Sequence, residues 1–126
     1  MPKQIIFTGN APKPPPYFSQ AVKSGGFVFV AGQGPFDPVT GQVVGTTIQE
    51  QAAQSFRNVT AILTAAGSSL DKVVSATFIL AEESDFPGLN EEWVKWFPHD
   101  PPARQAAQLP VRPQNMKISI AVIAET

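Results

Sequence analysis

Residues 47–67, TIQEQAAQSFRNVTAILTAAG, decide the fold of this chain. Thr47 and Glu50 have the spacing of a capping box, in which each side chain accepts a backbone N–H at the start of a helix. Gly67 is the residue type that commonly follows the end of a helix. Between these two signals, apolar residues recur at helical spacing, at Ile48, Ala52, Phe56, Val59, Ile62, Leu63 and Ala66. The stretch predicts an amphipathic helix from about residue 47 to residue 66, whose apolar face packs on another layer.

Segments with the composition of β-strands lie on both sides of this helix. They are Lys3–Phe7, Phe27–Ala31, Lys72–Leu80 and Met116–Ala124. A second helix is expected to begin at Ser84, as its N-cap, and to end at Pro98. The elements follow one another as strands, a helix, a strand, a helix and two strands, with no repeated strand–helix unit. This order predicts the α+β class, with a mixed or antiparallel sheet that carries both helices on one face.

The longest strand segments predict that copies of the chain associate. Phe27–Ala31, Lys72–Leu80 and Met116–Ala124 carry apolar residues on both of their faces, whereas the two helices cover only one face of the sheet. A large uncovered apolar surface marks an interface. We therefore expect a homo-oligomer whose cyclic symmetry places the uncovered sheet faces around a central axis, with ligand pockets at the interfaces.

Length and composition narrow the possible functions. A chain of 126 residues is expected to form a single domain over residues 1–126 with its own hydrophobic core. The nine Lys and Arg residues are scattered and the formal net charge is −1, which predicts no nucleic-acid partner. The sequence has no cysteine, no apolar run that could span a membrane and no signal peptide. These features predict no disulfide, no thiolate metal site, no membrane partner and a cytoplasmic location.

One arginine is the strongest candidate for chemistry. Arg104 follows Pro101 and Pro102, which stiffen the backbone, and it precedes a run of small residues. A guanidinium held in this way presents a rigid fork of donors that matches a small carboxylate. The alternative is an arginine at the edge of a strand, in solvent.

Three other residues each have a structural and a functional interpretation, and a fourth has a structural one only. Tyr17 follows a run of prolines and is either a packed ring or a side chain in a pocket. Gly32, at a strand end, marks either a bulge or the close approach of a ligand. Asn90 is either a solvated flank of the second helix or a ligand contact. His99 has no Ser, Cys or second His nearby, which predicts a loop residue and no metal site.

Short motifs are spread over nearly the whole chain. They are Asn10–Pro12, Pro16–Tyr17, Val30–Gln33, Asp37–Gly41, Gln54–Val59, Ala65–Gly67, Asp85–Asn90, Pro102–Arg104 and Lys117–Ile120. Together they resemble those of the RidA/YjgF family of reactive intermediate deaminases, whose older label is L-PSP endoribonuclease.

The resemblance implies a chorismate-mutase-like α+β fold and a homotrimer whose sheets form a central barrel. It implies that each of three inter-subunit clefts binds a small carboxylate, a 2-imino or 2-oxo acid. It also implies the hydrolysis of 2-imino or 2-enamino acids, such as 2-iminobutanoate, to 2-oxo acids and ammonia, with no cofactor.

The resemblance assigns residues to this cleft as well. Arg104 corresponds to the arginine that clamps the substrate carboxylate. The backbone N–H of Ala106 helps to hold the same carboxylate, and deaminating members usually have a cysteine at this position. The residues that match the rest of the lining are Tyr17, Gly32 and Asn90.

One departure from the family divides the functional hypotheses. Ser119 stands where deaminating members have the glutamate that positions the attacking water, and a serine hydroxyl activates water poorly. The first hypothesis is a 2-iminobutanoate/2-iminopropanoate deaminase-like hydrolase that positions water with backbone carbonyls or Asn90. The alternative is a non-catalytic, ligand-binding or regulatory trimer. The third hypothesis, RNA cleavage, comes from the older label and conflicts with the lack of a basic surface.

Overall fold

The computed structural model describes residues 2–126. The strands are β1 (Gln4–Ile6), β2 (Ala21–Ser24), β3 (Phe27–Gln33), β4 (Val73–Leu80), β5 (Ala103–Gln108) and β6 (Ile118–Glu125). The α-helices are α1 (Ile48–Ala65) and α2 (Phe86–Trp96), and short 3₁₀ turns are formed by Leu70–Lys72, Glu83–Asp85 and Pro113–Asn115. Within this part of the chain, no helix has both the length and the apolar character that a membrane crossing requires.

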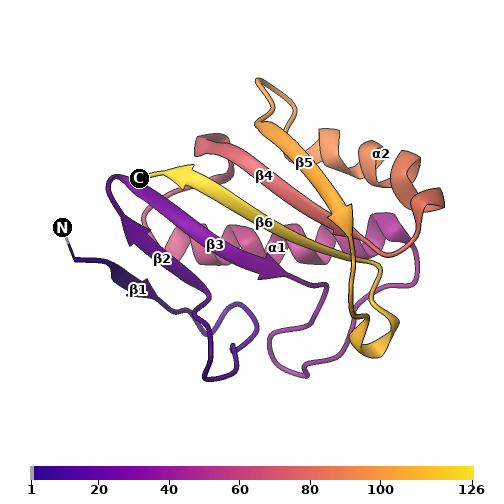
Figure 1. Ribbon diagram of the computed structural model, residues 1–126, viewed down its shortest axis with the longest axis horizontal. Helices are drawn as coiled ribbons and strands as arrows, with labels where there is room; N and C mark the ends of the chain where they lie inside the picture. Colours follow the sequence, from indigo (N-terminus) through magenta and orange to yellow (C-terminus); the bar gives the residue numbers. More distant parts are fainter. Residues whose placement is uncertain (1) are drawn as a thin grey trace.

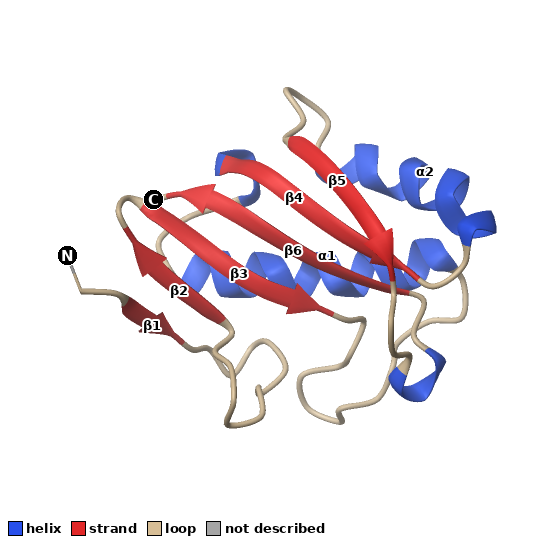
Figure 2. Ribbon diagram, in the orientation of Figure 1, coloured by secondary structure: helices blue, strands red, loops and turns tan. Residues whose placement is uncertain are grey.

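The strands of the described residues form one six-stranded sheet in the order β1-β2-β3-β6-β4-β5. Neighbouring strands are antiparallel, except for β4 and β5, which are parallel. Both helices lie on the same side of the sheet, behind it in Figure 1, and Figure 2 shows them in blue behind the red strands. The predicted fold class, a mixed α+β sheet with both helices on one face, is confirmed.

Helix α1 forms as its end signals predict. The N–H of Glu50 donates to Thr47 Oγ1 at 3.1 Å, and the N–H of Thr47 donates to Glu50 Oε1 at 3.1 Å. Ala66 caps the other end, and Gly67 follows with a φ of +78°, which residues with a Cβ rarely adopt. Both ends are set by residues close in sequence, so the predicted helix is confirmed.

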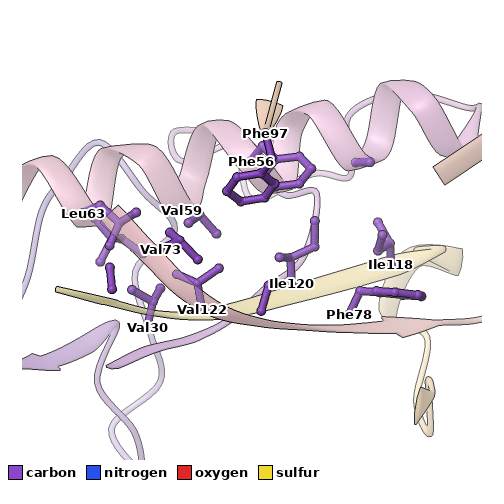
Figure 3. Packing of buried hydrophobic residues seen from close by; sticks show 14 of the residues in the cluster. Val30, Phe56, Val59, Leu63, Val73, Phe78, Phe97, Ile118, Ile120 and Val122 are labelled. Atoms are coloured by element: carbon purple, nitrogen blue, oxygen red, sulfur yellow. The ribbon is translucent and has the colours of Figure 1, made fainter. Parts of the chain in front are cut away.

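The apolar face of α1 packs against the sheet and against α2. Phe56 is fully buried, and its ring centre lies 5.4 Å from that of Trp93 and 5.5 Å from that of Phe97. Figure 3 shows this layer, with Ile120 and Val122 of β6 facing the helix. Full burial of one such side chain is worth about 1.5–3 kcal/mol, so the layer firmly fixes both helices against β4 and β6.

Helix α2 begins later than predicted. Ser84 is not its N-cap, because Ser84 lies inside the 3₁₀ turn Glu83–Asp85, which runs directly into the helix. Asp85 precedes the helix and caps no backbone N–H with its side chain; its Oδ2 lies 3.9 Å from Lys117 Nζ instead. Pro87 occupies the first turn, where a backbone N–H would have no intrahelical partner.

Strand β6 begins at Ile118 rather than at Met116 and extends to Glu125. The turn Pro113–Asn115 contains residues at positive φ, so the chain reaches Met116 out of a turn. Met116 is nevertheless buried, in a small cluster with Ala81 and Leu109. The predicted strand Met116–Ala124 therefore forms, but it begins two residues later than predicted.

The opposite side of the sheet, which we call the helix-free face, carries apolar side chains that are partly exposed. Val22, Phe29 and Ile123 are registered neighbours across three strands of this face. Phe29 is 44% exposed and Phe27 is 38% exposed. Because no helix of residues 2–126 covers this face, its apolar character agrees with the pattern predicted from the strands.

Candidate functional site

Arg104 lies on β5, the strand at the edge of the sheet next to α2 (Figure 1). Its side chain lies on the helix side of the sheet, against rings of β4 and α2. The register sets this orientation, because Arg104 pairs with Ala76, which is buried beneath the helices. The guanidinium carbon lies 4.9 Å from the ring centre of Phe78, 5.5 Å from that of Phe86 and 4.9 Å from that of Trp93. Cations are attracted to aromatic faces at these distances, so the three rings hold the guanidinium in place.

The charge of Arg104 has no acidic partner in the described chain. Its Nη1 donates to Asn90 Oδ1, on α2, at 2.8 Å. Arg104 takes part in none of the ion pairs within residues 2–126, which are Lys95–Glu92, Arg112–Glu82 and Lys117–Asp85. Partial burial lowers the pKa of Arg104 from its ordinary value, but an arginine remains protonated throughout the physiological range. The site presents a fixed and unneutralised positive charge.

The backbone of β5 supplies hydrogen-bond donors beside this charge. As the last strand of the sheet, β5 pairs on one side only, with β4. The N–H of Leu109 donates to the carbonyl oxygen of Leu80 at 3.0 Å. Backbone groups point to alternate sides along a strand, so the N–H groups of Arg104, Ala106 and Gln108 point away from β4. The free edge therefore offers the Ala106 N–H on the same stretch of strand as the Arg104 guanidinium.

A cavity of about 400 Å³ opens beside Ala106. Phe78 and Phe86, which contact the guanidinium of Arg104, also form part of its wall. Of the described residues that line it, Glu83 alone is acidic. We call Arg104, Asn90, Ala106 and this cavity the Arg104 group.

Gly32 and Ser119 lie together on the helix-free face. Ser119 stands between Ile118 and Ile120, which point into the helix-side core, so its own side chain points the other way. A bulge between Val30 and Gln33 shifts the register of β3 against β6 and contains Gly32. A Cβ at Gly32 would lie 2.7 Å from Ser119 Oγ, so these two positions are in direct contact.

Tyr17 lies toward the other edge of the sheet. Its side chain is 84% exposed and borders an open cavity of about 530 Å³, together with Phe18 and Phe29. Strands β6 and β4 separate β3 from β5. The expected site residues of one chain therefore do not all lie beside Arg104. We call Tyr17, Gly32 and Ser119 the Tyr17 group, and none of the three lines the cavity of the Arg104 group.

Comparison with known proteins shows what the chain is related to. The family model described as Endoribonuclease L-PSP matches residues 8–126. The chain belongs to the RidA/YjgF family. A RutC family protein of Pyrococcus horikoshii is 44% identical to this Rid chain over 122 residues, which cover 97% of each sequence.

Two further Rid relatives have more informative names. A 2-iminobutanoate/2-iminopropanoate deaminase of Capra hircus is 36% identical over 122 residues, which cover 97% of this chain and 89% of the relative. The crystal structure of E. coli TdcF with bound serine matches with a TM-score of 0.90 at 33% identity and covers 98% of each chain. The family resemblance and the Rid fold expected from the sequence are thereby confirmed.

The Arg104 group of this Rid chain contains residues that sequence reasoning did not single out for function. Phe86 and Trp93 lie in the predicted second helix and Phe78 lies in the predicted strand Lys72–Leu80, but none of the three was proposed as a site residue. The structure adds that all three rings lie against the guanidinium. Glu83 was not predicted as a site residue either. The consecutive glutamates Glu82 and Glu83 after a predicted strand could have indicated a charged site, but nothing local in the sequence distinguishes the one that lines the cavity.

Gln105, which follows Arg104 in the sequence, and His99 lie outside the Arg104 group. Gln105 faces the helix-free side and donates to Thr77 Oγ1 at 3.1 Å. His99 is an exposed loop residue that borders a separate cavity of about 110 Å³ with Trp96. Within residues 2–126, no group of three His, Cys, Asp or Glu side chains is arranged to hold a metal ion.

Proposed function

We propose that this Rid protein binds small 2-imino and 2-oxo carboxylates and hydrolyses 2-imino acids to 2-oxo acids and ammonia. The observation that carries the proposal is the guanidinium of Arg104, which three rings and Asn90 hold in place without an acidic partner. A carboxylate accepts two parallel hydrogen bonds from such a fork. The free N–H of Ala106 adds a third donor for the same anion.

The names of two relatives support this substrate class. One relative is named as a deaminase of 2-iminobutanoate and 2-iminopropanoate, and these ions each carry a carboxylate next to an imine carbon. The other was crystallised with serine, which also carries a carboxylate on the carbon that bears nitrogen. Arg104 and Ala106 are the groups in this chain that suit such a carboxylate.

We further propose that the complete site forms between subunits of a homotrimer. The Arg104 group and the Tyr17 group lie apart in one chain, so a neighbouring copy has to supply the second group. Cyclic association would also cover the apolar residues of the helix-free face, such as Phe29 and Ile123. In this arrangement Tyr17, Gly32 and Ser119 of one subunit line the cleft that holds Arg104 of the next.

The proposed hydrolysis involves no change of oxidation state. The oxygen of water adds to the imine carbon, a proton passes to the imine nitrogen, and the carbinolamine releases ammonia to leave the 2-oxo acid. Arg104 and the Ala106 N–H hold the carboxylate and so orient the adjacent carbon toward the water. The hydroxyl of Ser119 is able to hold this water by hydrogen bonds, but it is a poor base compared with a carboxylate.

Ligand binding without turnover is the second candidate function. Ser119 favours it, because its side chain supplies no carboxylate where deaminating relatives are expected to have one. Both candidates use the same clamp at Arg104. Replacement of Ser119 by Glu separates them: a gain in imine hydrolysis shows that only the carboxylate is missing, and unchanged activity argues against that explanation.

The experiment that tests the proposal measures ammonia release from 2-iminobutanoate, which a threonine dehydratase generates in the assay. We expect the wild type to accelerate release, Arg104→Ala to abolish the acceleration, and Arg57→Ala to keep it. Arg57 is a suitable control because it is an exposed arginine of α1 that bonds only the side chain of Gln54.

Binding of 2-oxobutanoate by calorimetry completes the test. If the wild type binds the ligand through Arg104 but releases no ammonia, the binding function holds and the hydrolase does not. If Arg104→Ala leaves affinity unchanged, the proposed clamp is wrong. The net charge of −1 and the scattered basic residues of this chain argue against RNA cleavage.

A further inference from the structure

Two consecutive glutamates follow β4, and only one of them has a partner. Glu82 Oε1 accepts a hydrogen bond from Arg112 Nη1 at 2.7 Å. The carboxylate of Glu83 forms no hydrogen bond and no ion pair with residues 2–126, and Glu83 lines the cavity of the Arg104 group. The pairing of Glu82 leaves Glu83 as the free negative charge of this region.

The cavity next to Glu83 has an amphipathic lining. Phe78, Leu80 and Phe86 give it apolar walls, and Glu83 gives it one anionic group. Long cationic side chains have the complementary character, because their methylene stems pack on apolar surfaces while their charged ends seek an anion or water. A second carboxylate is disfavoured in the same place, because like charges repel.

The cavity begins where the proposed carboxylate clamp ends. Ala106 supplies the free N–H of the clamp and also lines the cavity, which continues along β5 past Ala107 to Gln108. A ligand whose α-carboxylate lies between Arg104 and Ala106 therefore projects its side chain along the strand toward Glu83. This placement gives the ligand two contacts of opposite charge, one with the guanidinium of Arg104 and one with the exposed carboxylate of Glu83.

We propose that Glu83 makes the site selective for 2-imino and 2-oxo acids whose side chain ends in a positive charge, such as those derived from dibasic amino acids. The proposal rests on the proposed function, because it takes the α-carboxylate to be held by Arg104. Glu83 acts on the side chain of the ligand and takes no part in the hydrolysis. Neutral ligands are accepted, and dicarboxylates are disfavoured.

The test compares the affinities of three 2-oxo acids by calorimetry: 5-guanidino-2-oxopentanoate, 4-methyl-2-oxopentanoate and 2-oxoglutarate. We expect the wild type to bind them in that order, from the tightest to the weakest. In Glu83→Gln, we expect the affinity for the guanidino acid to fall about fivefold, which is the upper range for a solvent-exposed ion pair. The affinity for 2-oxoglutarate should rise, and that for the neutral acid should stay within about twofold.

Glu91→Gln is the matched control. It removes the same charge from an exposed position of α2 that borders none of the cavities described above. We expect it to leave all three affinities unchanged. The melting temperature of each variant verifies that the fold is retained.

The outcomes separate this inference from the function on which it rests. If the ratio of the affinity for the guanidino acid to the affinity for the neutral acid is the same in the wild type and in Glu83→Gln, the inference is wrong. An equal loss of affinity for all three ligands in Glu83→Gln also overturns the inference, because Glu83 would then support binding in general and would not select among side chains. If the wild type binds no 2-oxo acid, or if Arg104→Ala binds the neutral acid as tightly as the wild type, the proposed function fails together with the inference.

Discussion

Replacing Asn90 by aspartate should turn a residue that positions Arg104 into a competitor for the ligand. Asn90 Oδ1 accepts a hydrogen bond from Arg104 Nη1 at 2.8 Å. Aspartate has nearly the same shape as asparagine, so it keeps this acceptor and adds a negative charge at the same distance. The guanidinium then has an internal carboxylate in contact with it before any ligand arrives.

The size of the effect follows from the surroundings of the guanidinium. Opposite charges 4 Å apart attract by about 4 kcal/mol at an effective dielectric constant of 20 and by about 1 kcal/mol in water. Arg104 packs against three rings but is otherwise open to solvent, so we expect the attraction between the guanidinium and the introduced carboxylate to lie between these limits, at about 1–2 kcal/mol. This attraction opposes ligand binding and corresponds to a loss of affinity of about 5-fold to 30-fold. Asn90→Ala loses one hydrogen bond, worth about 1 kcal/mol, and should bind about fivefold more weakly than the wild type.

Calorimetry with 2-oxobutanoate at pH 7 measures the affinities of the wild type and of the two Asn90 variants. We expect the wild type to bind most tightly, then Asn90→Ala, then Asn90→Asp. Added salt should reduce the difference between the two variants, because it screens the introduced charge. An Asn90→Asp protein that binds as tightly as the wild type, or more tightly than Asn90→Ala, would refute the idea that Arg104 holds a carboxylate in this position.

Four further substitutions test the scaffold of the site. Phe56→Ala empties a fully buried position and should lower the free energy of unfolding by about 3–5 kcal/mol in urea; a loss under about 1 kcal/mol contradicts the packing. Gly45→Ala puts a Cβ 2.6 Å from Glu50 Cβ at a φ of +92°, so it should cost about 1–3 kcal/mol, and Gly41→Ala, with open space at a φ of +72°, should cost less. The Thr46 N–H is the main cause that lowers the pKa of Glu50 below its ordinary value of 4.5. The resulting stability is complete above that pH and is lost as the pH falls through the lowered pKa, so Glu50→Gln should flatten the acid side of a plot of melting temperature against pH.

The helix α1 is predictable because its signals act within a few residues. Thr47 and Glu50 satisfy backbone groups at one end, and Gly67 provides the conformation needed at the other. The start of α2 is not predictable in this way. Ser84 is a good capping residue by type, but Asp85 contacts Lys117, which is distant in sequence, and the segment forms a turn that continues into the helix.

The candidate site is predictable only in part, because its surroundings depend on strand pairing. Flanking prolines and the family resemblance identify Arg104 from the sequence alone. The parallel register of β4 and β5, which pairs Phe78 with Ala106, is what brings an aromatic wall and a cavity to this arginine. No local pattern specifies that register. The separation of Tyr17 from Arg104 likewise follows from the strand order, because β6 and β4 lie between β5, which carries Arg104, and β3, whose Phe29 lines the cavity beside Tyr17.

The place of β5 at the end of the sheet also shapes the dynamics of the clamp. β5 is held by β4 alone, and all of its residues are exposed, so its detachment requires little free energy. The amide hydrogens of Arg104 and Ala106 face solvent and should exchange quickly, whereas those of Gln105 and Ala107 should exchange only when β5 leaves β4. A ligand bound along this strand has to keep it docked. The residence time of the ligand would then be set by the opening rate of one edge strand as well as by the contacts of one arginine.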